Sequence, residues 1–236
     1  MPVEQINIGP ETLRRMSALD RYNDWIIERI MPWVGDTVLE VGAGIGNISR
    51  YFLDRKRLIL SDVNEEYLKI LREKFGDHPN VSYERYNLEE SASRLSDNKI
   101  DTIMALNVLE HIDHDVHALK EMASILSPGG HIILQLPAHK ILYGSIDRNL
   151  AHFRRYTIRE IRRKFDESGL KAECFFRMNM FGALGWFLYC RILKRPLLPE
   201  GPLSLFNKLT PVFMAVERTF PVPFGLSIIA VGRKED

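Results

Sequence analysis

The sequence predicts a doubly wound α/β fold with a mostly parallel sheet of seven strands. Short apolar runs rich in β-branched residues alternate with amphipathic helical segments, and a glycine-rich turn follows the first of these runs. The intervening helices are long enough for right-handed crossovers between parallel strands. A sheet built in this way is covered by helices on both faces, which explains why its strands are apolar throughout.

The elements follow one another regularly. We expect strands at 37–41, 57–61, 81–85, 100–106, 131–136, 171–177 and 225–234, and helices at 19–33, 47–53, 65–75, 115–126 and 158–168. Thr157 and Glu160 form a capping box that starts the last of these helices. Ser127 to Gly130 contains the glycines that end a helix and turn the chain into the next strand.

One connection is longer than the fold requires. We expect a single domain over residues 1–236, with an apolar insertion over residues 178–224 before the last strand. The charge-free part of this insertion, from Asn179 to Cys190, is shorter than the roughly 20 residues that cross a bilayer. Basic residues flank its aromatic and aliphatic side chains. The insertion is therefore a lid over an acceptor, a membrane-docking element or an oligomer contact.

The composition excludes several classes of protein. Hydrophobic residues make up 45% of the chain and charged residues 27%, which is typical of a globular protein and not of a disordered one. The formal net charge of +1 argues against a nucleic-acid-coating protein. Cys174 and Cys190 fit no metal-binding spacing and no disulfide framework, and no signal peptide is recognisable. We expect a cytoplasmic protein, with membrane association left open by the insertion.

The glycine-rich turn predicts a ligand site. Gly42, Gly44 and Gly46 follow a strand directly, at the sheet edge where such folds bind ligands. The dinucleotide pattern G-x-G-x-x-G would need its third glycine at position 47, which is Asn47. Glu40 instead places a carboxylate just before the turn, which suits an ammonium or sulfonium group better than a pyrophosphate.

Four motifs carry a resemblance to a known family. The stretches "VLEVGAGIGN", "SDVNEEYL", "ALNVLEHIDH" and "LSPGGHIILQLP" resemble, in order and spacing, the class I S-adenosylmethionine-dependent methyltransferases, and particularly the small-molecule branch that includes quinone-biosynthesis enzymes. The resemblance covers roughly residues 22–136.

The resemblance implies S-adenosyl-L-methionine as the cofactor and a set of residues that bind it. Glu40 would order the glycine loop, and the loop would contact the methionine part; Asp62 would hold the ribose. The implied cofactor-binding residues are Glu40, Gly42, Ala43, Gly44, Asp62, Val63, Asn87, Leu88, Asn107 and Val108. Many relatives have an acidic residue near position 87 that contacts the adenine amino group, whereas this chain has Asn87.

His111 is the candidate catalytic residue. It follows the fourth strand, and its imidazole can accept a proton near neutral pH, but it is equally compatible with a structural histidine. His114 and His117 extend the pattern to H-x-x-H-x-x-H. Three ligands at this spacing on a helix converge poorly, so we expect no metal ion.

The segment after the fifth strand is the candidate acceptor-binding region. Tyr143, His152, Arg154 and Tyr156 are residue types that bind a polar or phosphorylated acceptor. The competing interpretation is that they anchor the loop to the following helix.

Taken with the resemblance, these residues predict a methyltransferase that acts on a small or amphiphilic acceptor, lipid-linked and phosphorylated compounds included, by transfer to oxygen. The alternatives are an NAD-dependent oxidoreductase, which Asn47 disfavours, and a non-catalytic interaction module that keeps the fold. A homo-oligomer remains open because of the insertion.

Overall fold

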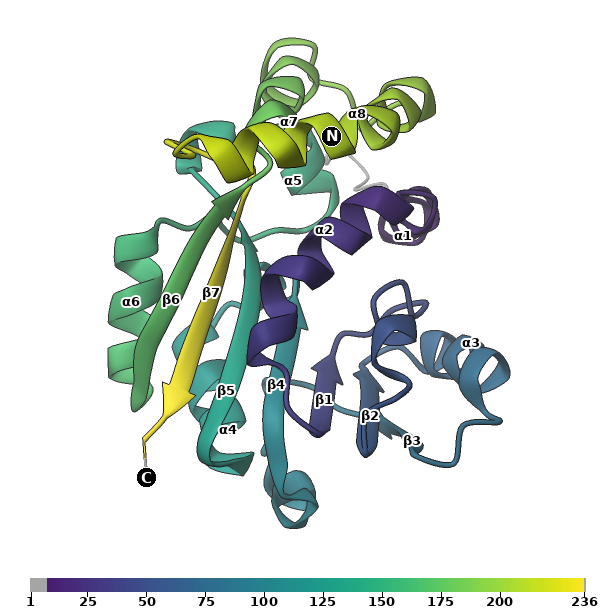
Figure 1. The fold of residues 1–236 in the computed structure, drawn as a ribbon, viewed down its shortest axis with the longest axis vertical. Helices are drawn as coiled ribbons and strands as arrows, with labels where there is room; N and C mark the ends of the chain where they lie inside the picture. The colour runs from purple at the N-terminus through teal and green to yellow at the C-terminus, as the bar shows by residue number, and fades with distance from the viewer. Residues whose placement is uncertain (1–7, 236) are drawn as a thin grey trace, which may run out of the picture.

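A seven-stranded sheet forms the centre of the molecule (Figure 1). The computed structural model describes residues 8–235, apart from the side chains of residues 93, 94 and 97. Residues 1–7, part of the stretch in which no signal peptide is expected, lie outside this range. The strands are β1 (Thr37–Val41), β2 (Arg57–Asp62), β3 (Val81–Arg85), β4 (Ile100–Leu106), β5 (Leu126–Pro137), β6 (Leu170–Met178) and β7 (Ser227–Lys234).

The strand order confirms the predicted doubly wound sheet. The order is β3-β2-β1-β4-β5-β7-β6, and the first five strands pair in parallel, whereas β7 pairs antiparallel with both β5 and β6. The chain reverses its winding direction between β1 and β4, so the carboxyl ends of these two strands flank the point where such sheets bind ligands.

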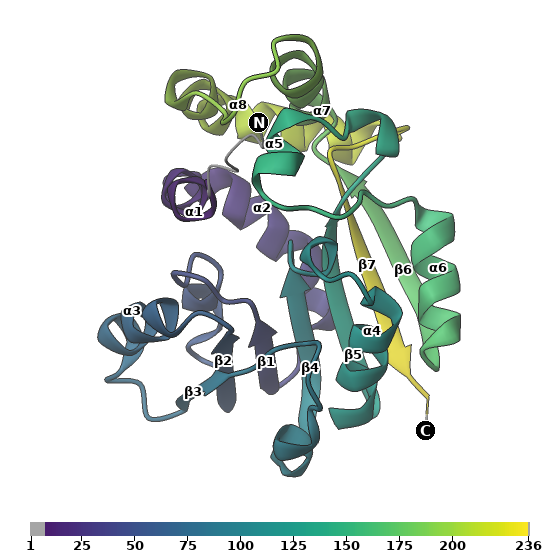
Figure 2. The same ribbon diagram turned by 180° about the vertical axis from the view of Figure 1, so that it is seen from behind.

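Helices cover both faces of the sheet (Figures 1 and 2). They are α1 (Gly9–Ser17), α2 (Asp20–Ile30), α3 (Glu65–Phe75), α4 (Asp115–Ile125), α5 (Ser145–Asn149), α6 (Ile158–Glu167), α7 (Met180–Trp186) and α8 (Glu200–Thr219). Short 3-10 turns lie at η1 (Met31–Trp33), η2 (Ser49–Phe52), η3 (Ser93–Asn98), η4 (Leu109–His111) and η5 (Lys140–Leu142), and η6 (Phe187–Ile192) is a π-helix.

Alternate residues of the strands build two separate cores. In β1, Leu39 packs with α4 and α6 on one face, while Val38 packs with α2 and α3 on the other. Trp25 of α2 and Phe165 of α6 are fully buried, one in each core. Successive side chains of a strand point to opposite faces, so this alternation follows directly from the pleat.

Most predicted boundaries agree with the structure, and three do not. The helix expected at 47–53 is the 3-10 turn η2, because Gly46 has a φ of +77° and lies against the ring of Phe75, which prevents a regular helix from starting there. The helix expected at 19–33 ends at Ile30 and continues as η1 around Pro32. Ser127 to Gly130, expected as a turn, lies inside β5.

The insertion stands at the carboxyl edge of the parallel strands. Figures 1 and 2 show α7 and α8 together at this end of the molecule, opposite the C-terminus. Phe181 of α7 stacks on Phe213 of α8 with ring centroids 4.4 Å apart. Glu217 of α8 accepts hydrogen bonds from the backbone N–H groups of Asn179 and Met180, which ties α8 to the end of β6. The insertion is therefore a packed part of the fold.

Candidate functional site

The glycine turn after β1 is held by the end of β2. Gly42 and Gly44 have φ angles of +67° and +56°, which favour glycine because a side chain would collide with the backbone. Asp62 accepts a hydrogen bond from the Gly44 N–H at 2.9 Å and another from the Asn64 N–H at 2.9 Å. The N–H of Ala43 donates to the carbonyl of Ser61. The two carboxylate oxygens of Asp62 retain further lone pairs, with which they can accept hydrogen bonds from ribose hydroxyls.

Glu40 is a buried carboxylate beneath this turn. It is only 4% exposed, and its Oε2 atom has no hydrogen-bond partner within the described structure. Burial raises the pKa of Glu40 to about 7, and the negative charge of Asp62 contributes in the same direction. A buried acceptor without a partner is costly, and a bound cation would remove that cost. Glu40 therefore fits a cofactor that carries an ammonium and a sulfonium group.

The other predicted cofactor residues lie along the same edge. Asn107 follows β4 with a φ of +56°, and its N–H donates to the carbonyl of Gln135. A Cβ at Gly42 would lie 2.6 Å from Val108 Cγ2, so the turn after β4 contacts the glycine turn. Val63 is 55% exposed beside the end of β2, as a residue flanking an adenine would be.

The segment after β3 is engaged within the protein. The Asn87 side chain accepts a hydrogen bond from the Glu89 N–H, so it caps its own turn. Leu88 is 2% exposed, and its side chain packs in the core. Any contact of Leu88 with a cofactor would therefore be made through its backbone.

Helix α1 covers the glycine turn, which the sequence did not predict. The side-chain amide of Asn47 donates to the carbonyl of Leu13, whose side chain lies 3.4 Å from where a Cβ of Gly44 would be. The Arg15 side chain donates to the carbonyl of Leu198 in the insertion. Helix α1 thus joins the glycine turn to the insertion. The sequence does not predict this helix because the helix is short and rich in polar residues. None of its residues is buried, so it lacks a clear hydrophobic period.

A second cluster lies next to the cofactor edge. Glu110, His111 and His152 each place one side-chain N or O atom within 4.8 Å of the others. The rings of His111 and His152 meet edge to face with centroids 4.7 Å apart, and His152 Nε2 is 4.0 Å from Glu110 Oε1. His152 is 41 positions away from His111 in the chain. The sequence identified both histidines but could not show that they meet.

The electrostatics of this cluster are set by burial. Neither carboxylate oxygen of Glu110 has a hydrogen-bond partner in the described structure, and burial raises the pKa of Glu110 to about 7. Burial and the neighbouring His152 lower the pKa of His111 to about 4, although part of its side chain reaches solvent. At neutral pH His111 is therefore an uncharged imidazole with a free acceptor nitrogen, and burial makes it a weaker base than an ordinary histidine.

His152 is oriented from behind by a carboxylate. Its Nδ1 atom lies 3.1 Å from Asp147 Oδ1, and the Arg155 side chain donates to the same oxygen at 2.8 Å. Burial alone would raise the pKa of Asp147, but the His152 hydrogen bond and the charge of Arg155 lower it below its usual value. An ionised Asp147 fixes the tautomer of His152 with Nε2 directed toward Glu110. Asp147 and Arg155 were not identified from the sequence.

By donor type, Glu110, His111 and His152 could hold a metal ion. Donor atoms around one tetrahedral zinc ion lie roughly 3.3 Å apart, which is closer than the separations of up to 4.8 Å in this cluster. The other two histidines of the sequence pattern are exposed: His114 lies directly before α4 and His117 lies in its first turn.

The predicted acceptor residues fall into two groups. Arg154 pairs with Asp113 at 2.7 Å and with Asp115 at 3.2 Å, and the Tyr156 hydroxyl donates to Asp115 at 3.0 Å. These contacts favour the anchoring interpretation for Arg154 and Tyr156. Tyr143 is half-buried and donates to the carbonyl of His152, so these two residues lie together.

The insertion is anchored to this same segment. The indole N–H of Trp186 donates to the carbonyl of Leu142, and the guanidinium of Arg155 lies 4.7 Å from the centre of the Trp186 ring. The Ser145 hydroxyl donates to the carbonyl of Cys190. The first half of the insertion is thus packed against the loop that carries His152.

Comparison with known proteins agrees with this geometry. Residues 38–130, which contain the glycine turn, Asp62 and His111, match the model of a methyltransferase domain. This match runs from β1 into β5 and so includes the cofactor edge of the sheet. The expected fold and the expected cofactor, S-adenosyl-L-methionine, are confirmed, and the nicotinamide-dependent alternative is disfavoured.

Curated proteins similar to this chain include methyltransferases of quinone biosynthesis. The chain is 35% identical over 107 residues to the ubiquinone/menaquinone biosynthesis C-methyltransferase UbiE of Enterobacter sp., covering 42% of each chain. It is 30% identical over 162 residues to the Escherichia fergusonii UbiE, covering 58% of this chain and 64% of the relative. The chain thus spans less than two thirds of the length of these relatives.

One solved structure resembles almost the whole chain. It comes from the complex of the Haloferax volcanii Trm112 methyltransferase activator with a protein described as a methyltransferase. The TM-score is 0.67 at 18% identity, with 98% of this chain and 96% of the other covered. This likeness extends the common fold through the insertion.

Proposed function

We propose that this protein transfers the methyl group of S-adenosylmethionine to an amphiphilic acceptor whose reacting atom must lose a proton. The observation that supports it is the cluster of Glu110, His111 and His152. Its first two residues follow β4, just after Val108, which contacts the glycine turn. When bound, the cofactor supplies a methyl group on a positively charged sulfur. The residues of this chain hold the cofactor and bring the acceptor into line with that methyl group.

His111 acts as the proton acceptor in this proposal. It is the solvent-accessible member of the cluster and is uncharged at neutral pH, so it can take a proton from an acceptor above it. His152 lies against the His111 ring, held by Asp147, and Glu110 lies behind both. The positive charge that forms on His111 is then stabilised by the ionised carboxylate of Glu110, which lies in the same cluster.

The acceptor is a hydroxylated aromatic or enolic compound with an apolar tail. Such a compound becomes a nucleophile at both oxygen and carbon once it loses a proton. The same base can therefore serve methylation at either atom. The alignment of the acceptor with the methyl group then determines which atom is methylated. The sequence favours oxygen, and the names of the relatives are those of carbon methyltransferases. The apolar insertion, packed on the His152 loop by Trp186, would cover the tail.

The test is incubation of the full chain with S-adenosylmethionine and a hydroxynaphthoquinone that carries an isoprenoid tail, in its reduced form. We expect a singly methylated product in the mass spectrum, and carbon-bound or oxygen-bound methyl is then assigned by proton NMR. Matched acceptors that lack the tail or the hydroxyl groups should react more slowly. Absence of product from every hydroxylated acceptor, with cofactor binding intact, would contradict the proposed acceptor class.

A further inference from the structure

The apolar side chains that reach solvent are concentrated in the insertion. Thirteen large hydrophobic residues of the described chain are exposed, and nine of them lie between residues 178 and 224, about a fifth of its length. These nine are Leu184, Phe187, Leu188, Ile192, Leu193, Leu205, Leu209, Val212 and Phe220. Single exposed apolar residues are ordinary, but a concentration of this kind marks an interaction surface.

These residues form stripes on helices whose opposite sides are packed. Leu205, Leu209 and Val212 are spaced by four and three positions on α8, and are 58%, 39% and 58% exposed. Phe206 and Phe213 of the same helix pack on the protein instead. Such a helix has an apolar side turned to the core and a second apolar side turned away from it.

The first half of the insertion repeats this pattern. Leu184, Leu188 and Ile192 follow one another at intervals of four across α7 and η6, and are 59%, 43% and 59% exposed. Ala183 and Cys190 of the same segment are buried. We call the exposed apolar residues of α7, η6 and α8, together with Leu193 and Phe220, the outer face of the insertion.

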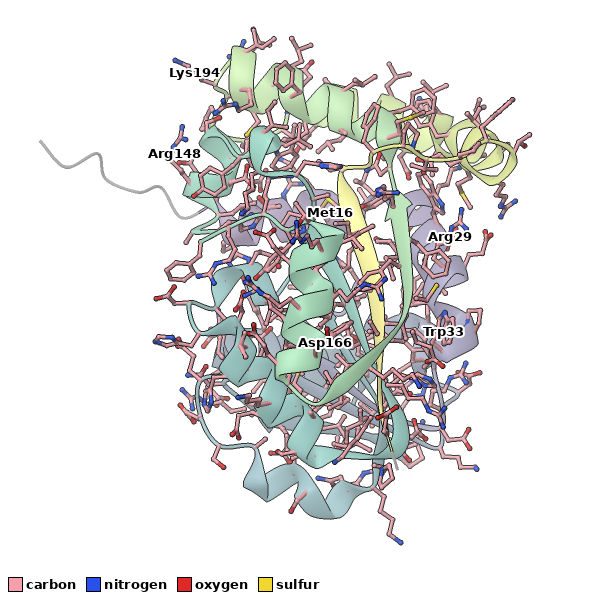
Figure 3. The ribbon with its side chains drawn as sticks, turned by 90° about the vertical axis from the view of Figure 1, so that its left-hand side faces the viewer. Met16, Arg29, Trp33, Arg148, Asp166 and Lys194 are labelled. Carbon is pink, nitrogen blue, oxygen red and sulfur yellow. The ribbon has the colours of Figure 1, made fainter. Side chains whose placement is uncertain are left out.

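Basic residues accompany this outer face, and acidic ones are absent from its first half. No Asp or Glu occurs between Glu173 and Glu200, whereas Arg191, Lys194 and Arg195 lie in that interval and are exposed. Within the described residues none of these three side chains forms an ion pair. Figure 3 shows Lys194 projecting from the end of the molecule that the insertion occupies. The surface thus combines leucines with unpaired positive charge.

The insertion is also placed and sized for an interface. It lies at the carboxyl edge of the parallel strands, above the segment that carries His152 (Figures 1 and 2). No helix among the described residues has the length and hydrophobicity to span a bilayer. Amphipathic helices that carry apolar side chains and flanking Lys and Arg, without the apolar length of a membrane span, are typical of elements that lie in the headgroup layer.

We propose that the outer face of the insertion docks on the surface of a bilayer that contains anionic lipid. The leucines enter the boundary between headgroups and acyl chains, and Arg191, Lys194 and Arg195 pair with lipid phosphates. A second copy of the chain fits this surface less well. A twofold contact centred on the basic segment would bring its positive charges together, with no carboxylate between Glu173 and Glu200 to neutralise them.

The proposal is tested by co-sedimentation of the full chain with vesicles of phosphatidylcholine, with and without phosphatidylglycerol. We expect binding only to the vesicles with phosphatidylglycerol, and weaker binding at high salt. The double variant Lys194→Gln, Arg195→Gln should lose about 25-fold in partitioning, at about fivefold for each charge. The control variant Arg163→Gln, Lys171→Gln removes two charges that are exposed on α6 and β6 and should bind normally.

A second pair of variants tests the apolar contribution. Leu209 on α8 and Ile70 on α3 have the same exposed fraction of 39%, so Leu209→Ser and Ile70→Ser are matched. Only Leu209→Ser should weaken vesicle binding, by at least about threefold. Both variants should melt close to the native protein because neither side chain is buried.

Two results would overturn the proposal. One is failure of the native protein to bind phosphatidylglycerol vesicles at low salt, and the other is binding that the insertion variants leave unchanged. A dimer in sedimentation equilibrium that Leu209→Ser dissociates, without vesicle binding, would assign the outer face to a second copy instead. None of these measurements involves methyl transfer, so their outcome is independent of the proposed reaction.

Discussion

The cofactor edge and the acceptor side of this molecule are built in different ways. The cofactor edge uses short motifs in which the interacting residues are close in sequence, such as the glycine turn at 42–46 and the β2 end at Asp62. The acceptor side is assembled from 109–111, 140–156 and the insertion, which meet only in the folded chain. This difference explains why the cofactor can be predicted from the sequence and the acceptor cannot.

The largest expected effect is on the acceptor side. The variant His111→Ala should lower kcat by about 10²- to 10⁴-fold, because it removes the proposed proton acceptor, while the affinity for S-adenosylmethionine changes little. Steady-state kinetics and calorimetric titration measure the two quantities separately. His114→Ala removes an exposed histidine three residues away and serves as the control. Equal losses in turnover and cofactor affinity would refute the role of His111.

A substitution at the cofactor edge should lower the affinity for S-adenosylmethionine more than it lowers turnover. The variant Gly42→Ala places a Cβ 2.6 Å from Val108 Cγ2 at a φ of +67°, so the glycine turn must shift. We expect S-adenosylmethionine affinity to fall about 10-fold or more, at a strain of ~1–2 kcal/mol. Turnover at saturating cofactor should fall much less. A Gly42→Ala protein with native cofactor affinity would show that the turn does not contact the cofactor.

Glu40 makes cofactor binding depend on pH. Its pKa of about 7 in the free protein means that a bound cation must draw it into the ionised form, with release of a proton below that pH. Affinity should therefore rise, by up to about tenfold per pH unit, as the pH increases toward 7, and then level off. Titrations at several pH values in buffers of different ionisation enthalpy measure both the affinity and the proton release. The variant Glu40→Gln, which has no such group, should show a flatter profile.

A small effect is expected at the insertion. Gly185 lies in α7, and a Cβ built there meets no other atom within 4 Å. The variant Gly185→Ala should raise the free energy of unfolding by about 0.5–1 kcal/mol because alanine loses less backbone entropy in a helix. Chemical denaturation measures this change. Destabilisation instead would indicate that the insertion changes shape and needs the glycine.

The fold was predictable because hydrophobic periodicity reports local structure. The strands at 37–41, 81–85 and 100–106 and the helix at 65–75 agree with the structure at both ends. Helix α1 was missed because its residues bury little, and a pattern of burial is what the sequence reveals. The turn η2 was mistaken for a helix because Gly46 needs a left-handed conformation that composition does not show.

The site was predictable only as far as contacts are local. The Asp62 contact with Gly44 spans 18 positions across one parallel strand pair, where the topology of the fold fixes the neighbour. The contact of His111 with His152 depends on how a loop after β5 folds back over η4. Asp147 and Arg155 stand behind His152 for the same reason. Loop geometry of this kind has no periodic signature in the sequence.

The central claim is that the edge formed by the glycine turn and Asp62 binds S-adenosylmethionine, and calorimetric titration tests it most directly. The native protein should bind one equivalent. The variant Asp62→Ala, which loses both the ribose acceptor and the hydrogen bond from Gly44, should bind about 100-fold more weakly or not at all. The control Asp166→Ala on α6 should bind as the native protein does. Absence of binding by the native protein, or unchanged binding by a folded Asp62→Ala variant, would contradict the claim.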